Sequence, residues 1–350
     1  MRETMKKEVF GKTSSGEEVF SYTLSNDNGM EVVLTDFGGT ILKILFPDKN
    51  GNKLDVVLGC DNMEQYEDNS NFFGSFVGPC ANRTANAEAT IDGVSYSLEK
   101  NDGENNLHTN VPCGMNKRVW QTTCGDNCVT FHTTLKDGEY VFPGNRSFWM
   151  TYTLTDKNEL KIDYRVESDK NTVLNLTNHS YFNLEGHAGK TIKNHQLQMK
   201  ASNFTPVVKG AIPTGEIRPV SGTPLDWSKS KGLFDEIESD YEQMQLVNGY
   251  DHNYVIDGYG NGVREFARLY APATGIAMYT ATDLPGVQLY TANWVENAVG
   301  KEGMVYQQRS GVCLETQHYP DTIHHDNFPS NVFGPERPYE STTIYRFAVE

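Results

Sequence analysis

The chain has 350 residues, of which 37% are hydrophobic, and a formal net charge of −16 from 30 basic and 46 acidic residues. No Lys/Arg-rich run offers the basic face that a nucleic-acid-binding protein needs. No apolar stretch approaches the roughly 18 residues that span a bilayer. We therefore expect neither nucleic acid nor a membrane as a partner, and we expect a neutral or cationic ligand.

The length does not require more than one domain, because large β-sandwiches reach it as a single unit. The chain has no linker, repeat or low-complexity tract, so we expect a single domain over residues 1–350. The segment 1–10 is charged and lacks the apolar core of a signal peptide. The six cysteines follow no zinc-site spacing, so we expect reduced thiols in a cytoplasmic protein, although Cys124 and Cys128 could pair in an exported one.

Alternation of polar and apolar residues dominates the chain and predicts half-buried strands. Near the N-terminus, strands at 31–35 and 40–46 flank a Gly-Gly turn. The clearest case is a hairpin of the segments 148–154 and 159–166, joined by a turn at 156–158. Further short strands are expected at 275–282, 287–291, 312–316 and 342–349.

Helical periodicity is scarce along the chain. Residues 62–68 and 233–245 could each form a short helix, and the Pro- and Gly-rich segment 205–226 is expected to run over the surface. Many strands and few helices predict an all-β fold, specifically a large antiparallel β-sandwich.

Polar clusters interrupt the predicted strands. Asn82 and Arg83 follow small residues, and the Arg can present a guanidinium fork to ligand oxygens. His108 lies in a loop among Asn and Thr residues. Taken alone, each of these clusters is more typical of an exposed turn than of a binding site.

The run 174–184 is a more informative cluster. Its alternation places Asn175, Thr177, His179 and Tyr181 on one strand face. Burying such a face is costly unless each polar group finds a hydrogen-bond partner. The pattern favours a strand that lines a polar cleft, against the alternative of a solvent-facing edge strand.

Two carboxylates occupy comparable positions. Glu315 ends a predicted apolar strand and Asp251 precedes another. Each suits a cleft that binds hydroxyl groups, and the plain alternatives are an outward-facing charge and a turn-stabilising Asp. The sequence contains no Gly-rich phosphate loop, nucleophile elbow or His-Glu-x-x-His zinc motif. The His-His-Asp run at 324–326 is more typical of an exposed loop than of a metal site.

Together, these clusters resemble the galactose mutarotases, also called aldose 1-epimerases. The matching segments occur in the family's order over nearly the whole chain. They are Ala81-Asn82-Arg83, Asn106-Leu107-His108, 176–184 (LTNHSYFNL), 249–253 (GYDHN), 284–291 (LPGVQLYT) and 314–321 (LETQHYPD), with shorter matches at 222–226 and 327–329.

The resemblance implies a galactose mutarotase-like β-supersandwich with a sugar cleft across one sheet. It implies an isomerase that interconverts the α and β anomers of galactose or glucose and needs neither a cofactor nor a metal. It further implies that His179 is the general acid and Glu315 the general base. The sugar-binding residues that it implies are Asn82, Arg83, His108, Tyr181, Asp251 and Gln288, with Asn82 and Tyr181 in supporting roles.

Three positions depart from the family pattern. Pro79 stands where the family usually has an Arg, and Thr109 and Asn110 stand where it usually has two glycines. All three neighbour the implied binding residues without replacing them. We therefore expect them to affect sugar preference and affinity more than the chemistry.

Mutarotation requires one acid and one base. It removes the proton of the C1 hydroxyl, protonates the ring oxygen, and reverses both steps after rotation about the C1–C2 bond. A Glu, with an unperturbed pKa of about 4.3, is already a carboxylate at neutral pH. For His179 we expect the carboxylates of Asp251 and Glu315 to raise the pKa above its usual ~6.5 and so keep the ring protonated.

Two alternative functions use the same residues. A glycoside hydrolase would need Asp251 as its second acidic partner and would leave His179 without a task. A non-catalytic carbohydrate-binding protein would leave both His179 and Glu315 unexplained. No Lys/Arg cluster adjoins the motifs, so free sugars are favoured over sugar phosphates. The sequence is compatible with a monomer or a homodimer.

Overall fold

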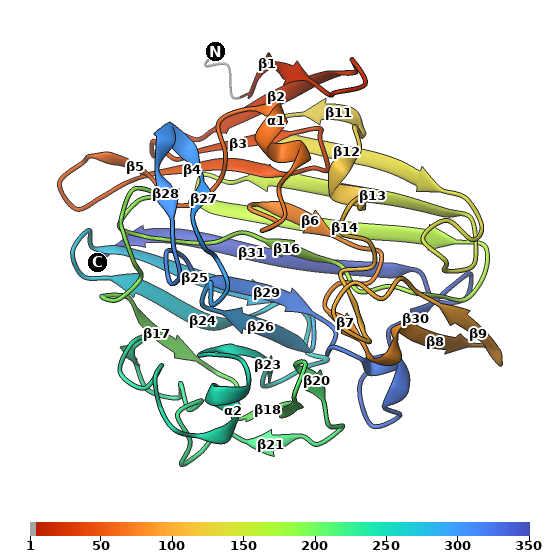
Figure 1. Cartoon of the computed structure of the whole chain (residues 1–350). Helices are drawn as coiled ribbons and strands as arrows, with labels where there is room; N and C mark the ends of the chain where they lie inside the picture. The colour runs from red at the N-terminus through yellow and green to blue at the C-terminus, as the bar shows by residue number, and fades with distance from the viewer. Residues whose placement is uncertain (1–4) are drawn as a thin grey trace.

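Alternating side chains build the largest sheet of the computed structural model, which describes residues 5–350 (Figure 1). In the predicted hairpin, Leu160, Ile162, Tyr164 and Val166 are buried, while the residues between them are partly or fully exposed. The hairpin therefore forms as predicted, in the middle of a nine-stranded antiparallel sheet. In spatial order the strands are β11 (Gln121–Gly125), β12 (Cys128–Leu135), β13 (Arg146–Leu154), β14 (Glu159–Ser168), β31 (Tyr339–Val349), β25 (Ile276–Thr282), β24 (Arg264–Ala271), β17 (Gln196–Met199) and β22 (Lys231–Gly232).

The N-terminal strands form a five-stranded meander beside this sheet. Gly38 and Gly39 turn the chain between its third and fourth strands with φ angles of +66° and +59°. A Cβ on Gly39 would come within 1.9 Å of the Met150 side chain, so the predicted Gly-Gly turn also permits close packing of the two sheets. The strands are β1 (Met5–Lys12), β2 (Glu18–Ser25), β3 (Glu31–Thr35), β4 (Ile41–Pro47) and β5 (Lys53–Asp55).

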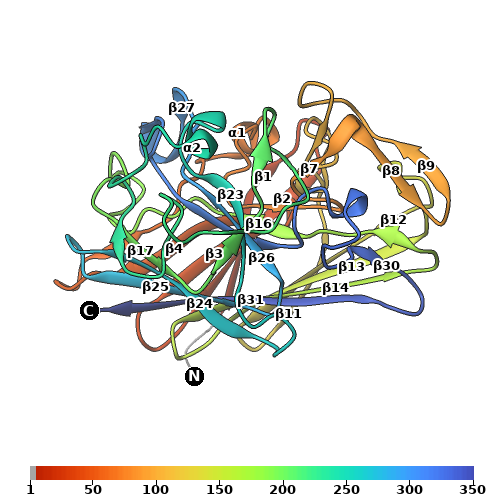
Figure 2. The same ribbon diagram turned by 90° about the horizontal axis from the view of Figure 1, so that it is seen from below.

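A second layer covers the inner face of the broad sheet and carries the conspicuous polar residues. Figure 2 shows β16, β23 and β26 above the plane of β14, β24 and β31. Tyr345 of the broad sheet packs on Phe182 and donates a hydrogen bond to the Leu314 carbonyl of the upper layer, at 3.0 Å. The main sheet of this layer contains, in spatial order, β21 (Arg218–Pro219), β18 (Asn203–Phe204), β23 (Asp251–Val255), β26 (Gly286–Tyr290) and β29 (Cys313–Gln317).

Short two-stranded pairs complete the fold. Two of them hold candidate residues, namely β6 (Ser75–Val77) with β16 (Thr177–His179), and β7 (Arg83–Thr84) with β10 (Asn106–Leu107). The others are β8 (Glu88–Ile91) with β9 (Val94–Ser97), β15 (Thr172–Val173) with β30 (Val332–Phe333), β19 (Val207–Val208) with β20 (Ile212–Pro213), and β27 (Ala298–Val299) with β28 (Val305–Tyr306).

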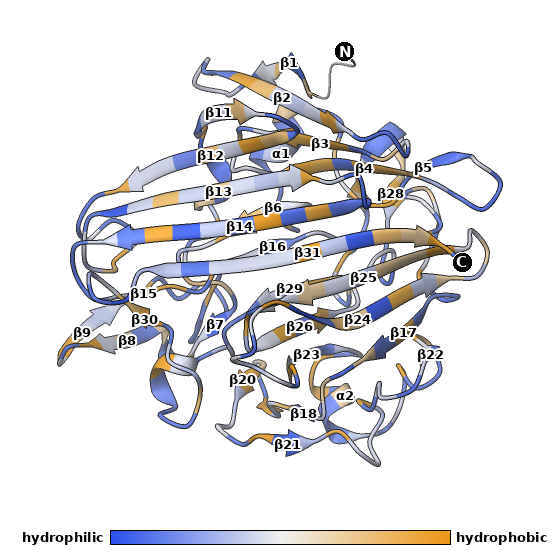
Figure 3. Ribbon diagram, turned by 180° about the vertical axis from the view of Figure 1, so that it is seen from behind, coloured by the Kyte–Doolittle hydropathy of each residue, from blue (hydrophilic) through white to orange (hydrophobic). Residues whose placement is uncertain are grey.

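The outer face of the broad sheet faces solvent. Figure 3 shows hydrophilic and hydrophobic residues alternating along its strands. The apolar members point inward to a core that fills the space between the two layers. The predicted antiparallel β-sandwich is therefore confirmed. Its broad sheet packs against the layer whose strands carry the polar clusters.

Two predictions about irregular segments were wrong in part. α1 (Met63–Glu67) forms as expected, with the Asn62 side chain capping its first turn. The second predicted helix is restricted to α2 (Glu242–Leu246), because 233–241 forms successive turns that bury Leu233 and Ile237 in the core. The segment 205–226 is not purely superficial, since Val220 and Leu225 are core residues.

Further expectations concern membrane spans, cysteine pairing, the N-terminal segment and the number of domains. No helix among residues 5–350 is long and apolar enough to cross a membrane. All six cysteines are unpaired, Cys124 and Cys128 included. The expectation for the segment 1–10 falls partly on residues 1–4, which lie outside the described residues. The single-domain organisation stays a prediction.

Candidate active site

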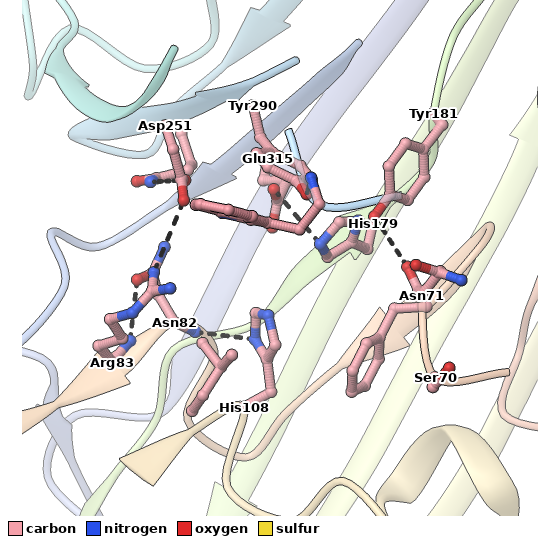
Figure 4. Close-up of a pocket in the computed structure, with 14 residues that line it drawn as sticks. Ser70, Asn71, Asn82, Arg83, His108, His179, Tyr181, Asp251, Tyr290 and Glu315 are labelled. Carbon is pink, nitrogen blue, oxygen red and sulfur yellow. Dashed lines mark hydrogen bonds and ion pairs between the residues drawn. The ribbon is translucent and has the colours of Figure 1, made fainter. Parts of the chain in front are cut away.

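The polar clusters converge on one cavity of about 280 Å³ at the edge where β16 meets β29 (Figure 4). All eight residues singled out from the sequence line it, together with six others. The lining residues are Ser70, Asn71, Phe72, Asn82, Arg83, Leu107, His108, His179, Tyr181, Asp251, Gln288, Tyr290, Trp294 and Glu315.

Strand register brings four of these residues side by side. Glu315 of β29 lies opposite Gln288 of β26, and Asp251 of β23 lies opposite Tyr290. The sequence interpretation placed Glu315 at the end of its strand, but it is the central residue of β29 and only 2% exposed. The outward-facing alternative for this carboxylate is therefore excluded.

The run 174–184 contributes two side chains to the cavity, His179 and Tyr181. The prediction that Asn175 and Thr177 also line it was wrong, because the two earlier residues lie under neighbouring segments. Asn175 donates hydrogen bonds to the carbonyls of Ala81 and His318. All of residues 174–184 are buried, so the run is not a solvent-facing edge strand.

His179 and Glu315 form the floor of the cavity. His179 Nε2 lies 3.7 Å from Glu315 Oε1, too far for a strong direct hydrogen bond. Glu315 Oε2 is buried without a partner. The imidazole is held between aromatic rings, with Tyr181 stacked at 5.0 Å and Phe72 at 6.0 Å. The pair thus presents one ring nitrogen and one free carboxylate oxygen to whatever enters.

Burial dominates the electrostatics of this pair and overturns one expectation. It lowers the pKa of His179 to about 4, although we expected nearby carboxylates to raise it. Burial also raises the pKa of Glu315 well above its usual value, and the neighbouring charge of Asp251 adds to this rise while Arg83 opposes it. For either group, the cost of burying a charge exceeds the stabilisation that neighbouring charges provide. Burial therefore favours the uncharged form of each group over its charged form.

The opposite wall consists of loop residues in unusual backbone conformations. Asn82 and His108 have φ angles of +64° and +57°. The backbone N–H of Asn82 donates to His108 Nδ1 at 3.1 Å. Since Nδ1 accepts this bond, the neutral ring carries its proton on Nε2 and offers it as a donor. Burial lowers the pKa of His108 well below its usual value, so the ring stays neutral. Both loop clusters are thus part of the pocket, and the exposed-turn alternatives are excluded.

An ionic network joins this wall to the sheet. Arg83 Nε donates to Asp102 Oδ2 at 2.8 Å, and its NH1 lies 3.9 Å from Asp251 Oδ2. Gln288 Nε2 donates to Asp251 Oδ1 at 2.6 Å. Burial raises the pKa of Asp251, and Arg83 and Gln288 both work against this rise. The result is a fixed set of donors and acceptors suited to hydroxyl groups.

A buried arginine outside the cavity supports the segments next to Asp251 and Trp294. Arg309 donates to the Asn248 carbonyl and to the side chain of Asn293, the residue before Trp294. Gly249 lies between Asn248 and the strand that begins with Asp251, with a φ of +121°. A Cβ at this position would come within 2.7 Å of the guanidinium, so only glycine fits.

The three departures from the family pattern lie outside the cavity lining. Thr109 adopts a φ of +66°, and its hydroxyl exchanges hydrogen bonds with the backbone of Cys80, both at 2.9 Å. The Asn110 side chain accepts from the Cys113 N–H at 2.7 Å. The Pro79 carbonyl accepts from the backbone N–H of Asn175. These residues brace the loops of the site without entering it.

One cluster within residues 5–350 has the residue types and spacing of a metal site. It consists of His179, Cys313 and Glu315, whose ligand atoms lie within 4.8 Å of one another. In the His-His-Asp run His324 and Asp326 are exposed and His325 is partly buried, and both histidines turn toward Asp321, at 2.6 and 3.5 Å.

Six lining residues were missed by the sequence interpretation. Tyr290 could have been found, because it lies two residues after Gln288 on the same strand face. Ser70, Asn71 and Phe72 come from a loop with no periodic pattern. Trp294, 61% exposed, stands at the rim, and its backbone N–H donates to the Tyr290 hydroxyl at 3.1 Å.

The chain is similar in sequence and in structure to known proteins of one family. The sequence profile of the family described as aldose 1-epimerase matches residues 21–346. The chain belongs to the aldose 1-epimerase family. It is 38% identical to a galactose mutarotase of Bos taurus over 97% of this chain and 98% of that protein. It is also 38% identical to the Homo sapiens galactose mutarotase, with the same coverage of both chains.

Bacterial members of the aldose 1-epimerase family match as well. The Escherichia coli (strain K12) aldose 1-epimerase is 35% identical over 94% of this chain and 95% of its own. Among solved structures, a galactose 1-epimerase from Lactobacillus acidophilus has a TM-score of 0.85 and 27% identity, and covers 99% of this chain and 98% of its own. A C. elegans aldose epimerase homologue has a TM-score of 0.86 and 30% identity, over 93% of this chain and 98% of its own. The supersandwich fold is therefore that of the family.

Proposed function

We propose that the protein is an aldose 1-epimerase that interconverts the anomers of free galactose or glucose, with His179 as general acid and Glu315 as general base. The observation that carries this proposal is the 3.7 Å separation of His179 Nε2 and Glu315 Oε1 at the floor of the cavity. The ring oxygen and the C1 hydroxyl of a pyranose are attached to the same carbon, so both can contact this pair at once. The names of the relatives, galactose mutarotase and aldose 1-epimerase, agree with this chemistry.

Ring opening is a transfer of one proton in and one proton out. Glu315 Oε2, which has no protein partner, accepts the proton of the C1 hydroxyl. His179 Nε2 donates a proton to the ring oxygen, and the C1–O bond to that oxygen breaks as the C1 carbonyl forms. Rotation about the C1–C2 bond presents the other face of the aldehyde, and the same two groups return their protons. Only protons move, so the reaction requires no cofactor.

The two histidines of the pocket differ in their fitness for the acid role. The general acid must lose its Nε2 proton and remain a neutral imidazole, which then carries its proton on Nδ1. His108 cannot do this without conflict, because its Nδ1 accepts the Asn82 N–H. His179 has no N–H group aimed at its Nδ1, whose neighbour is the sulfur of Cys313. This difference supports His179 as the acid and His108 as a donor to a sugar hydroxyl.

Burial of the acid–base pair favours ring opening. Before proton transfer the pair is an imidazolium and a carboxylate, and after transfer it is an imidazole and a carboxylic acid. The low pKa of His179 and the raised pKa of Glu315 both favour the second, uncharged arrangement. Proton transfer from the charged pair is therefore downhill, although the charged pair is the minor form before the sugar reacts.

The remaining residues hold the sugar in this geometry. The cavity offers acceptors at Asp251 and donors at Arg83, His108 and Gln288. Tyr181 supports His179, because its ring stacks on the imidazole and its hydroxyl donates to the Asn71 carbonyl. Asn82 fixes the His108 tautomer through its backbone and reaches toward Gln317 with its side chain.

The geometry disfavours both alternatives. A hydrolase would use two carboxyl groups on a glycosidic bond, but the group that faces Glu315 most closely is His179, and both oxygens of Asp251 face other protein groups. A simple binding protein gains nothing from a desolvated acid–base pair. We further propose a single-domain cytoplasmic enzyme, active as a monomer or homodimer on a monosaccharide.

Polarimetry of freshly dissolved α-galactose and α-glucose tests the proposal. The wild type should speed equilibration of at least one sugar, and Glu315→Gln should lower kcat by about 10²–10⁴-fold while still binding sugar. A fully active Glu315→Gln variant would remove Glu315 from its role. Binding without any acceleration would support the binding-protein alternative, and release of the aryl group from an aryl galactoside would support the hydrolase.

A further inference from the structure

Behind the general acid lies a group to which the mechanism so far gives no task. Cys313 is the residue two positions before Glu315 on β29, and its side chain therefore faces the same side of the strand. Its sulfur lies 3.5 Å from His179 Nδ1, and the residue has no solvent exposure. His179 thus has Glu315 at one ring nitrogen and Cys313 at the other.

The direction of this sulfur contact decides which nitrogen is available for catalysis. If the thiol donates to Nδ1, the neutral ring carries its proton on Nε2 and has no lone pair for the mobile proton. If Nδ1 donates to the sulfur, Nε2 is free to take up and release that proton. The acid role proposed for His179 requires the second arrangement, because Nε2 is the nitrogen that faces Glu315.

We propose that Cys313 is a positioning residue that accepts the Nδ1–H of His179, and so reserves Nε2 for the proton exchanged with the sugar. The sulfur fixes the tautomer of the ring, and the stacked Tyr181 helps to fix its orientation. This proposal rests on the general acid role proposed above for His179.

An uncharged partner suits this position. Burial raises the pKa of the Cys313 thiol well above its usual value, and the neighbouring carboxylates of Glu315 and Asp251 add to this rise. The group is therefore a neutral thiol and a weak acceptor. A carboxylate in its place would stabilise the imidazolium and hold the proton back from the ring oxygen. The thiol orients the ring and adds no charge.

The tautomer can be read directly from ¹⁵N NMR of histidine-labelled wild-type protein at neutral pH. We expect His179 to show a protonated Nδ1 and a bare Nε2, and His108 to show the reverse, because Asn82 donates to its Nδ1. A His179 protonated on Nε2 in the neutral state would overturn the proposal. This measurement does not depend on activity, so it can fail while the mutarotase assignment stands.

Variants supply the kinetic arm of the test. Cys313→Ala should lower kcat for galactose about tenfold, the smaller end of what losing the partner of a functional histidine costs, with KM changed less than twofold. Cys313→Ser, which restores an acceptor, should recover most of the loss. Cys60→Ala is the matched control, since Cys60 is a buried thiol of the same apolar cluster and is not in contact with His179. Equal losses in Cys313→Ala and Cys313→Ser, or none in either, would contradict the assigned role.

Discussion

The two walls of the cavity are built in different ways. The wall that holds His179 and Glu315 consists of paired strands, whose register fixes each side chain against its neighbour. The wall that holds Arg83 and His108 consists of the two-residue strands β7 and β10 and loops with left-handed residues, held by a few hydrogen bonds and an ion pair. The difference indicates a division of tasks. In the proposed mechanism, the sheet supplies the groups that move protons, and the loops supply donors that recognise hydroxyls.

Matched replacement of the two histidines is the strongest test of whether the two walls have separate tasks. His179→Gln removes the acid, so kcat should fall about 10²–10⁴-fold with KM nearly unchanged. His108→Gln removes one donor to the sugar, so KM should rise about tenfold with kcat within a few-fold, the effect of one lost hydrogen bond. Polarimetry over a range of galactose concentrations separates the two parameters. Similar kcat losses in both variants would show that the walls share the chemistry.

The pH profile sharpens the assignment of the sheet wall. The active pair holds a single proton. Below the low pKa of His179, at about 4, a second proton binds and Glu315 is no longer a base. Above the raised pKa of Glu315 the pair loses its only proton and the acid is gone. We therefore expect kcat/KM to be level above about pH 5, to fall about tenfold per unit below the acidic limb, and to fall again on the alkaline side as Glu315 loses its proton.

This profile needs one control. Asp36, outside the cavity, has a pKa that burial raises to about 6 and would titrate inside the level range. Asp36→Asn should leave both limbs in place. A rate that already falls tenfold between pH 7 and pH 6 in this variant would mean that the acid–base pair is not governed by burial.

Removal of the loop arginine should have a smaller effect. Arg83→Met takes away the cation that opposes the raised pKa of Asp251 and leaves that carboxyl group a poorer acceptor. We expect KM for galactose to rise about tenfold, equivalent to about 1.4 kcal/mol or one pKa unit, with kcat little changed. Arg218→Met, which removes a half-exposed ion pair with Glu216, should leave both parameters unchanged. A kcat loss above tenfold in Arg83→Met would place it with the sheet wall.

The sequence predicted the sheet wall better than the loop wall. Period-two alternation identified the strands and, with it, the shared face of His179 and Tyr181, and it would also have given Tyr290 from Gln288. Alternation says nothing about Ser70 or Trp294, because loops have no repeating geometry that places a side chain. It also overextended the cleft to earlier residues of the His179 strand, since the pattern does not show which segments cover a strand.

The charges in the site were predicted less well than the residues. From the sequence, neighbouring carboxylates were expected to raise the pKa of His179. Burial, which depends on the fold, lowers this pKa instead. Before the structure, only the family resemblance implied that His179 and Glu315, far apart in the chain, act as one pair, and their separation of 3.7 Å comes from the fold.

The shared proton of the His179–Glu315 pair has a consequence for the response to salt. The pair has no net charge before or after the sugar ring opens, and both side chains are almost fully buried. Mobile ions screen interactions over about 8 Å at physiological ionic strength, and they act on exposed charges far more than on buried ones. The turnover of saturated enzyme should therefore be nearly the same in dilute buffer and in concentrated NaCl, so that this catalyst tolerates large changes in the ionic composition of its surroundings.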